Sequence, residues 1–143
     1  MPEQNYQQHT QRVPLFMAVG LALVASVIGA GVNLYQSFGD HQRLYSASLI
    51  FVLTVCTLIV GFFARTFALK AQDRAIRAEE NLRHFAAAGR LLDSKLSMKQ
   101  IIALRFASDG EFVELAKKAA NTSMEPDAIK QAIKNWRADW HRV

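Results

Sequence analysis

The side chains best suited to catalysis or metal binding are scattered along this sequence rather than clustered. The four histidines, His9, His41, His84 and His141, lie one per segment, and Cys56 is the only cysteine. No two of them have the spacing that is typical of metal ligands. A glycine-rich phosphate loop, a nucleophile elbow and a zinc-protease motif are all missing from the sequence. The residues therefore predict a protein that is not an enzyme, with no cofactor, no metal and no small-molecule substrate.

Arg105 and Asp109 are the most suggestive charged pair, because they lie four residues apart where two predicted short helices meet. We expect an ion pair that joins the two helices; the alternative is a docking site for a partner on the module surface. Ile129, Ile133 and Trp136 lie on one face of a later helix. We expect these three residues to form the core of the module or its docking surface.

Two long apolar runs must position every other element. Residues 15–34 contain no charged side chain and are long enough to span about 30 Å of hydrocarbon. Residues 45–64 form a second run of the same kind, and residues 36–43 make a short turn between them. So short a connection predicts an antiparallel transmembrane hairpin. Because neither run contains an ionisable side chain, a proton relay or a transporter-type coupling site is not expected.

The second apolar run continues into a charged helix without a break. Residues 44–88 contain no proline, and Gly89 is the first residue that suits a helix end, in a left-handed cap. At 1.5 Å per residue this helix is about 65 Å long, with about half of its length inside a bilayer. On its charged part, the pairs Glu79 with Arg83 and Glu80 with His84 predict weak stabilising contacts.

Both long helices carry a face of small side chains. In the second helix these residues alternate spacings of three and four, which is the period of a left-handed coiled coil. In the first helix they repeat every four residues, a pattern that supports close helix crossing in a membrane. The predicted packing residues are Thr57, Gly61, Ala64, Ala68, Ala71, Ala75, Ala78, Leu82 and Phe85 in the second helix and Ala18, Ala22, Ser26 and Ala30 in the first.

The distribution of charge predicts the orientation of the hairpin. The net charge is +5, and residues 65–143 hold 15 of the 17 Lys and Arg residues and 10 of the 12 Asp and Glu residues. Basic residues beside a membrane-spanning helix favour the cytoplasmic side, so both termini are expected in the cytoplasm and the turn outside. The residues expected to contact anionic lipid headgroups are Arg65, Lys70, Arg74 and Arg77.

Short capped helices are predicted after Gly89. Ser97 with Gln100 forms one capping box, and Ser108 with Glu111 forms a second, so each pair predicts the start of a helix. Pro126 is suited to the first turn of a third helix. An amphipathic stripe predicts that this third helix continues as far as Trp140. The stripe consists of Ile129, Ala132, Ile133, Trp136 and Trp140.

The sequence thus predicts an all-α membrane protein, a two-helix transmembrane hairpin whose second helix extends into the cytosol and is followed by a module of three short helices. The segments are a cytoplasmic tail (1–12), transmembrane helix 1 (13–35), an external turn (36–44), transmembrane helix 2 (45–65), its cytosolic extension (66–89) and the module (90–143).

Several motifs in the chain resemble a family of small two-span bacterial membrane proteins of unknown function. The motifs are IIALRFASD at 101–109, IKQAIKNW at 129–136, QDRAIR at 72–77, Gln4-Asn5-Tyr6 with His9, and the closing Arg142-Val143. The resemblance covers the whole chain and implies a location in the bacterial inner (plasma) membrane. It implies no activity and no catalytic or ligand-binding residue.

We therefore expect a non-enzymatic assembly or accessory protein, which packs through its small-residue faces against itself or against other subunits of a membrane complex. Its expected partners are lipids and membrane proteins, and the protein is expected to be oligomeric.

Two alternatives stay open at this point. An oligomer of hairpins could form a channel, although Ser26 alone would give a hydrophobic constriction at best. A membrane-tethered nucleic-acid binder would use a basic face on the last helix, but a face of this kind is normally solvated, so nucleic acid is not an expected partner. That basic face would comprise Lys130, Lys134, Arg137 and Arg142.

Overall fold

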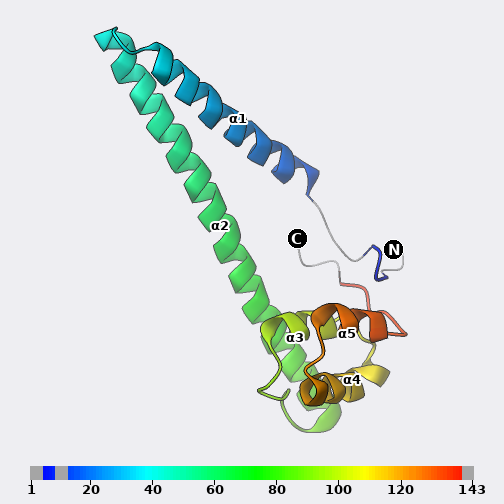
Figure 1. The fold of residues 1–143 in the computed structure, drawn as a ribbon. Helices are drawn as coiled ribbons and strands as arrows, with labels where there is room; N and C mark the ends of the chain where they lie inside the picture. Colours follow the sequence, from blue (N-terminus) through cyan, green and yellow to red (C-terminus); the bar gives the residue numbers. More distant parts are fainter. Residues whose placement is uncertain (1–4, 9–12, 140–143) are drawn as a thin grey trace. The chain divides into compact units, whose positions relative to one another are not determined.

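The protein is all-helical throughout the part of the chain that the structure, a computed structural model, describes: residues 5–8 and 13–139. The described residues form five helices and no strand (Figure 1). The helices are α1 (Pro14–Gln36), α2 (His41–Ala88), α3 (Met98–Leu104), α4 (Asp109–Thr122) and α5 (Pro126–Ala132).

The chain divides into two compact units, and α2 belongs to both. One unit is Arg12–Ala68, and the other comprises Leu69–Val143 together with Met1–Gln11. The second unit is therefore larger than the module of three short helices that the sequence predicts (90–143), because it also includes the last five turns or so of α2. The buried residue Ile76 of α2 belongs to the same apolar core as α3, α4 and α5.

In the first unit, α1 and α2 form a helical hairpin with a tight turn. Pro14 occupies the first turn of α1, where its missing N–H costs nothing. At the other end, the Ser37 hydroxyl donates to the Asn33 carbonyl over 2.7 Å. Gly39 then reverses the chain with φ of 104°, and the Asp40 carboxylate accepts the Arg43 backbone N–H at 3.2 Å, as an N-cap does.

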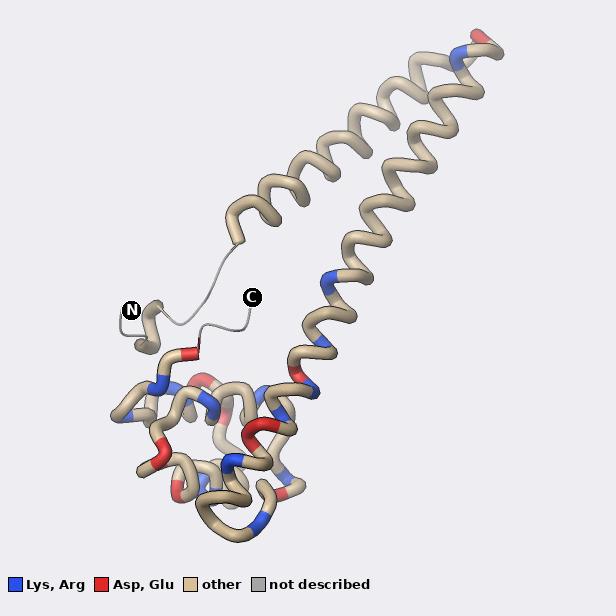
Figure 2. The backbone as a smooth tube through the Cα atoms, turned by 180° about the vertical axis from the view of Figure 1, so that it is seen from behind, with Lys and Arg blue, Asp and Glu red and all other residues tan. Residues whose placement is uncertain are grey.

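The two helices of the hairpin approach each other closely near this turn. Ala30 and Ala47 are buried there, and a Cβ atom on Gly31 would lie 3.5 Å from the Phe51 ring. Away from the turn most large apolar side chains are exposed; Leu15 and Leu21, for example, are 74% and 72% exposed. Both helices are long and apolar enough to cross a membrane. Figure 2 shows no charged residue along α1 and none on α2 between Arg43 and Arg65.

The long helix α2 ends as the sequence predicts. Its last residue is Ala88, and Gly89 follows in the left-handed region with φ of 70°. The Gly89 N–H still bonds to the Phe85 carbonyl at 2.8 Å, so the cap completes the hydrogen-bond ladder before the chain turns away.

The core of the module is formed by α3, α4, α5 and one face of α2. Its largest fully buried side chains are Phe106, Phe112, Ile101, Leu104 and Ile129. The predicted capping box of α3 is confirmed: Ser97 Oγ accepts the Gln100 N–H at 3.3 Å, and Gln100 Oε1 accepts the Ser97 N–H at 2.8 Å. Gln100 also donates to the Met124 carbonyl at 2.8 Å, which ties α3 to the turn before α5.

The second predicted capping box is wrong in its chemistry, although α4 does begin directly after Ser108. The Ser108 side chain caps no backbone N–H. The carboxylate of Glu111 instead accepts the backbone N–H groups of Lys134 and Asn135 at 3.1 and 3.0 Å. The Glu111 carboxylate, which would accept the Ser108 N–H in a capping box, therefore binds the backbone of residues 134 and 135 instead.

The prediction of a last helix continuing through Trp136 is also wrong. Helix α5 ends at Ala132, and Ile133 is already extended, with φ of −71° and ψ of 123°. The chain then pairs with residues 106–108: Ser108 N–H bonds to the Asn135 carbonyl at 3.0 Å, and Arg137 N–H to the Phe106 carbonyl at 2.7 Å. Trp136 packs on Phe106, with ring centroids 5.1 Å apart. These non-local contacts outweigh the helical periodicity; Trp140 lies outside the described residues.

Candidate functional site

Arg83 on α2 holds the module together by polar contacts. Its guanidinium reaches Glu80 Oε2 at 3.1 Å and Asp109 Oδ1 at 2.6 Å, and it donates to the Ala107 carbonyl at 2.7 Å. The same group lies 4.2 Å from the centre of the Phe112 ring, a cation–π contact. One side chain therefore joins α2 to the end of the α3–α4 connection, to the first residue of α4 and to the Phe112 ring in the core.

Other residues on the same face of α2 complete this contact. Ile76, Glu80 and His84 follow one another at intervals of four residues, and all three are buried. The His84 Nδ1 lies 2.7 Å from the Arg90 carbonyl, and its ring meets the Phe112 ring edge to face. Beside them, Asn81 Oδ1 accepts the Leu92 N–H at 3.2 Å. The module is thus packed on one defined face of the helix.

The ion pairs inside the module differ from those that the sequence predicts. Arg105 does not pair with Asp109; it lies 3.0 Å from Asp139, whereas Asp109 pairs with Arg83. Arg83 in turn pairs with Glu80 rather than with Glu79. Sequence spacing of four residues favours contacts within one helix, but packing of separate segments places other charges closer.

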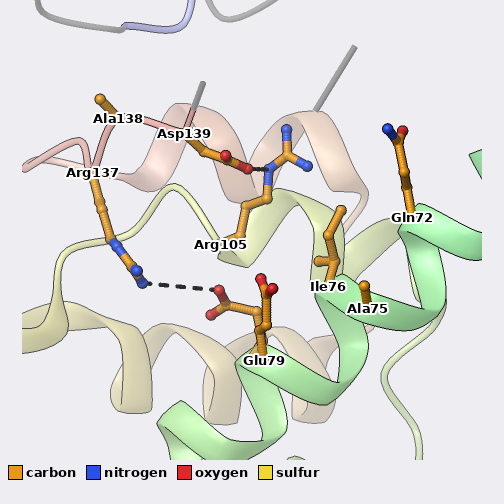
Figure 3. Close-up of a pocket in the computed structure, with 9 residues that line it drawn as sticks. Gln72, Ala75, Ile76, Glu79, Arg105, Arg137, Ala138 and Asp139 are labelled. Atoms are coloured by element: carbon orange, nitrogen blue, oxygen red, sulfur yellow. Dashed lines mark ion pairs between the residues drawn. The ribbon is translucent and has the colours of Figure 1, made fainter. Parts of the chain in front are cut away.

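A pocket of about 270 Å³ lies between this face of α2 and the C-terminal segment of the module (Figure 3). Arg105 and Asp139 face each other on one wall, and Arg137 reaches toward Glu80, with Nη1 and Oε1 4.0 Å apart. Gln72 Oε1, at the edge of the pocket, is buried and accepts no hydrogen bond from the described residues. The lining residues are Gln72, Ala75, Ile76, Glu79, Glu80, Arg105, Arg137, Ala138 and Asp139.

Burial raises the pKa of Glu80 above its ordinary value of 4.5, although the neighbouring Arg83 and Arg137 act in the opposite direction. Such a carboxyl group can take up a proton, and the neighbouring Glu79, which also lines the pocket, raises the pKa of Glu80 further. The positions of Arg83 and Arg137 make Glu80 an internal counter-ion for both arginines. The chemistry of this pocket is that of a structural ion-pair network.

The residues of the predicted small-residue face of α2 are not buried by the module, although Ala75 lines the edge of the pocket. Thr57, Gly61, Ala64 and Ala68 are exposed in the first unit. In the second unit Leu82 is 69% exposed and Phe85 is 53% exposed. The remaining members of the face, Ala71, Ala75 and Ala78, are exposed as well.

The predicted ladder on α1 is mostly uncovered by the rest of the chain. Ala30 alone of its four members is buried, beside the turn of the hairpin, and the Ser26 hydroxyl donates to the Ala22 carbonyl within the helix. Ala18, Ala22 and Ser26 are exposed. Gly31, next to Ala30, is the α1 position where a Cβ atom would lie 3.5 Å from the Phe51 ring of α2.

The two predicted sets of basic residues, the lipid-contacting set on α2 and the basic face of the last helix, have different outcomes in the structure. Lys70, Arg74 and Arg77 are exposed on α2, and the Arg65 guanidinium lies 5.3 Å from the centre of the Phe16 ring. The basic face predicted for the last helix does not form. Lys130 is in α5, where it pairs with Asp127, but Lys134 and Arg137 lie beyond its end and Arg142 lies outside the described residues.

Sequence reasoning missed Arg83 and Glu111 as organising residues and identified Glu80 only as a partner of His84. The sequence did contain a signal for Glu80 and for its partner Arg83. Ile76, Glu80 and His84 share one helical face, so a charge at Glu80 beside a buried apolar position predicts a buried partner nearby. No local pattern indicates that Glu111 binds the backbone of residues 134 and 135.

The described residues thus define an all-helical protein in which two helices are suited to crossing a membrane and a charged helical module is packed on the end of the second. A family model matches residues 1–143 of this chain and shows to which proteins the chain is related. The chain belongs to DUF6526, a family of unknown function. Comparison with curated proteins found no match, and comparison with solved structures found none either.

Proposed function

We propose that this chain is a non-enzymatic integral membrane protein that assembles, with itself or with a larger membrane complex, through the small-residue face of α2. In this proposal α1 and the first half of α2 span a bacterial inner membrane, and both termini lie in the cytoplasm. The excess of Lys and Arg after residue 64 supports this orientation.

The observation that carries the proposal is the exposure of apolar side chains on the charged half of α2. Leu82 and Phe85 project from a part of the helix that carries several charged residues and that we place outside the membrane. Large apolar groups at two successive positions of one seam are unfavourable in water unless another surface covers them. The module packs on another side of α2, through Ile76 and Glu80, and leaves Leu82 and Phe85 uncovered.

The small residues extend the same seam toward the apolar half of α2. Gly61 and Ala71 allow a second helix to approach closely where hydrocarbon provides no hydrophobic driving force. No atom outside the helix lies within 4 Å of the place where a Cβ atom on Gly61 would be. A Cβ atom at residue 61 therefore meets no neighbour among the described residues, and a larger side chain there projects toward the surface that we assign to the partner.

The test is the mass of the full-length protein purified from its own membranes in a gentle detergent. We expect a complex larger than one chain for the wild type, and dissociation of this complex by Gly61→Leu or Ala71→Leu. Ile59→Leu is the matched control, because Ile59 is a neighbouring exposed residue on the side of the helix away from the seam. A lone monomer, or a complex that both substitutions leave intact, would contradict the proposal.

A further inference from the structure

The charges beside the seam of α2 indicate which partner it accepts. We propose that α2 pairs with α2 of a second copy of this chain as a parallel coiled coil in register, flanked by two identical ion pairs between Arg74 and Glu79. This inference rests on the proposed function and names the partner.

The seam follows the heptad pattern of a coiled coil. With Ala75 and Leu82 at a positions, Ala71, Ala78 and Phe85 fall at d positions. In this register the residue before an a position is a g residue, and the residue after a d position is an e residue. Arg74 is therefore at g and Glu79 at e.

In a parallel coiled coil, a g residue lies opposite the e residue of the partner helix five positions further along. Arg74 of one copy therefore lies opposite Glu79 of the other, and two-fold symmetry repeats this contact on the other side of the seam. The charges are opposite in sign, as such a pair requires. The register that buries Leu82 against Leu82 thus also places these two charges together.

Both side chains are available for this contact. Arg74 and Glu79 are exposed, and neither forms an ion pair with another residue in the described ranges 5–8 and 13–139. Arg83, four residues after Glu79, has the spacing of an ion-pair partner for Glu79 within the helix. The Arg83 guanidinium instead pairs with Glu80 and Asp109. Among the described residues, this charged pair therefore has no partner within the chain.

The module leaves room for this partner. The buried contact with the module uses the back of the helix: Ile76 and Arg83 are at b positions and Glu80 is at an f position. Ala75 and Glu79 border the pocket beside the module, but both stay exposed, as do Leu82 and Phe85. The parallel orientation follows from the proposed topology. Identical chains with the same charge distribution insert in the same direction, so their α2 helices run the same way through the membrane.

The experiment co-expresses two full-length copies that carry different affinity tags and measures the fraction of complexes that contain both tags. Arg74→Glu alone and Glu79→Arg alone each place two like charges opposite each other in a homodimer. We expect each of these homodimers to associate about fivefold more weakly than the wild type. In a mixed complex of the two variants, both contacts join opposite charges again.

The expected result is therefore a preference for the mixed complex. Two wild-type copies should combine at random, with about half of the dimers carrying both tags, whereas R74E with E79R should give about four fifths mixed dimers if each homodimer is weakened about fivefold. The control is R77E with E114R, which makes the same changes of charge at exposed positions away from the seam and should stay at about one half. Recovery in the mixed complex also shows that both variants fold.

Three outcomes would overturn the inference. A fraction of one half for R74E with E79R would show that these residues do not face each other in a parallel pair. One copy of the chain bound to a different protein would show another occupant of the seam, while the proposed function would stand. A lone monomer in the wild type would contradict both.

Discussion

At the scale of single residues, Arg83 is the side chain on which the contact between α2 and the module depends. It contacts the buried Glu80, the exposed Asp109 and the Ala107 carbonyl, and it lies over the Phe112 ring. Removing it would leave Glu80 buried with Arg137 as its nearest positive charge, 4.0 Å away. A buried charge that loses its partner is strongly destabilising, whereas the exposed Asp109 contributes little.

We therefore predict that Arg83→Ala lowers the free energy of unfolding of the module by about 3 kcal/mol. Urea unfolding of the full-length protein in detergent, followed by tryptophan fluorescence, measures this change. Arg77→Ala is the control; Arg77 is exposed, and we expect a change within about 0.5 kcal/mol. Equal effects of the two substitutions would show that Arg83 has no special structural role.

Glu80 predicts a dependence of stability on pH. Burial raises its pKa above 4.5, so above that pH the folded chain retains a proton that the unfolded chain has released. The free energy of unfolding therefore falls as the pH rises from about 4.5 through the raised pKa. We expect Glu80→Gln to become more stable relative to the wild type over this interval, as measured by urea unfolding. A difference that does not change with pH would contradict the assignment.

Glu111 predicts the opposite dependence. Burial alone would raise the pKa of Glu111, but hydrogen bonds from the backbone N–H groups of Asn135 and Lys134, together with one from the Ser108 hydroxyl, outweigh it and lower the pKa below 4.5. The stability that this carboxylate contributes is present above that pH and is lost as the pH falls through the lowered pKa. We expect the wild type to be more stable than Glu111→Gln at neutral pH and the two to converge in acid.

At the scale of helices, the sequence predicts those ends that local chemistry determines. The capping box of Ser97 with Gln100 and the left-handed Gly89 are both present, because neighbouring residues satisfy the open backbone groups of each helix end. The end of α5 could not be predicted in this way. Trp136 has the helical spacing of a core residue, yet its position depends on Phe106 and Glu111, which lie more than twenty residues away in the chain.

The same distinction applies to the candidate site. The small-residue seam is a regular pattern in one helix, so the sequence reveals it directly. The partners of Arg83, Arg105 and Asp109 depend on how separate segments pack, and the spacing of charges along the chain does not determine that packing.

A glycine that ends a helix and a glycine inside a helix predict opposite effects of substitution by alanine. Gly89 has φ of 70°, so Gly89→Ala should destabilise the module by about 1 kcal/mol even though a Cβ atom would meet no neighbour. Gly110 lies inside α4 with open space around it, so Gly110→Ala should stabilise by up to about 1 kcal/mol. Urea unfolding measures both, and the same sign for the two variants would contradict this explanation.

At the scale of the whole molecule, the proposed topology predicts which residues are accessible from each side of the membrane. In a Cys56→Ser background, Phe38→Cys in the turn should react with a membrane-impermeant maleimide in intact cells or spheroplasts. Ser94→Cys, exposed in the module, should react only after the membrane is opened. The reverse pattern of labelling would mean that the orientation of the hairpin is wrong.

The central claim is that another helix covers the seam on the charged half of α2. Its most direct test places single cysteines at residues 70–85 in a Cys56→Ser background and compares their labelling by maleimide in native membranes and in denaturing detergent. We predict protection at Ala71, Ala75, Ala78, Leu82 and Phe85, with full labelling in membranes at Lys70 and Arg77, which lie off the seam. Labelling of the seam positions in membranes as complete as that at Lys70 and Arg77 would contradict the account.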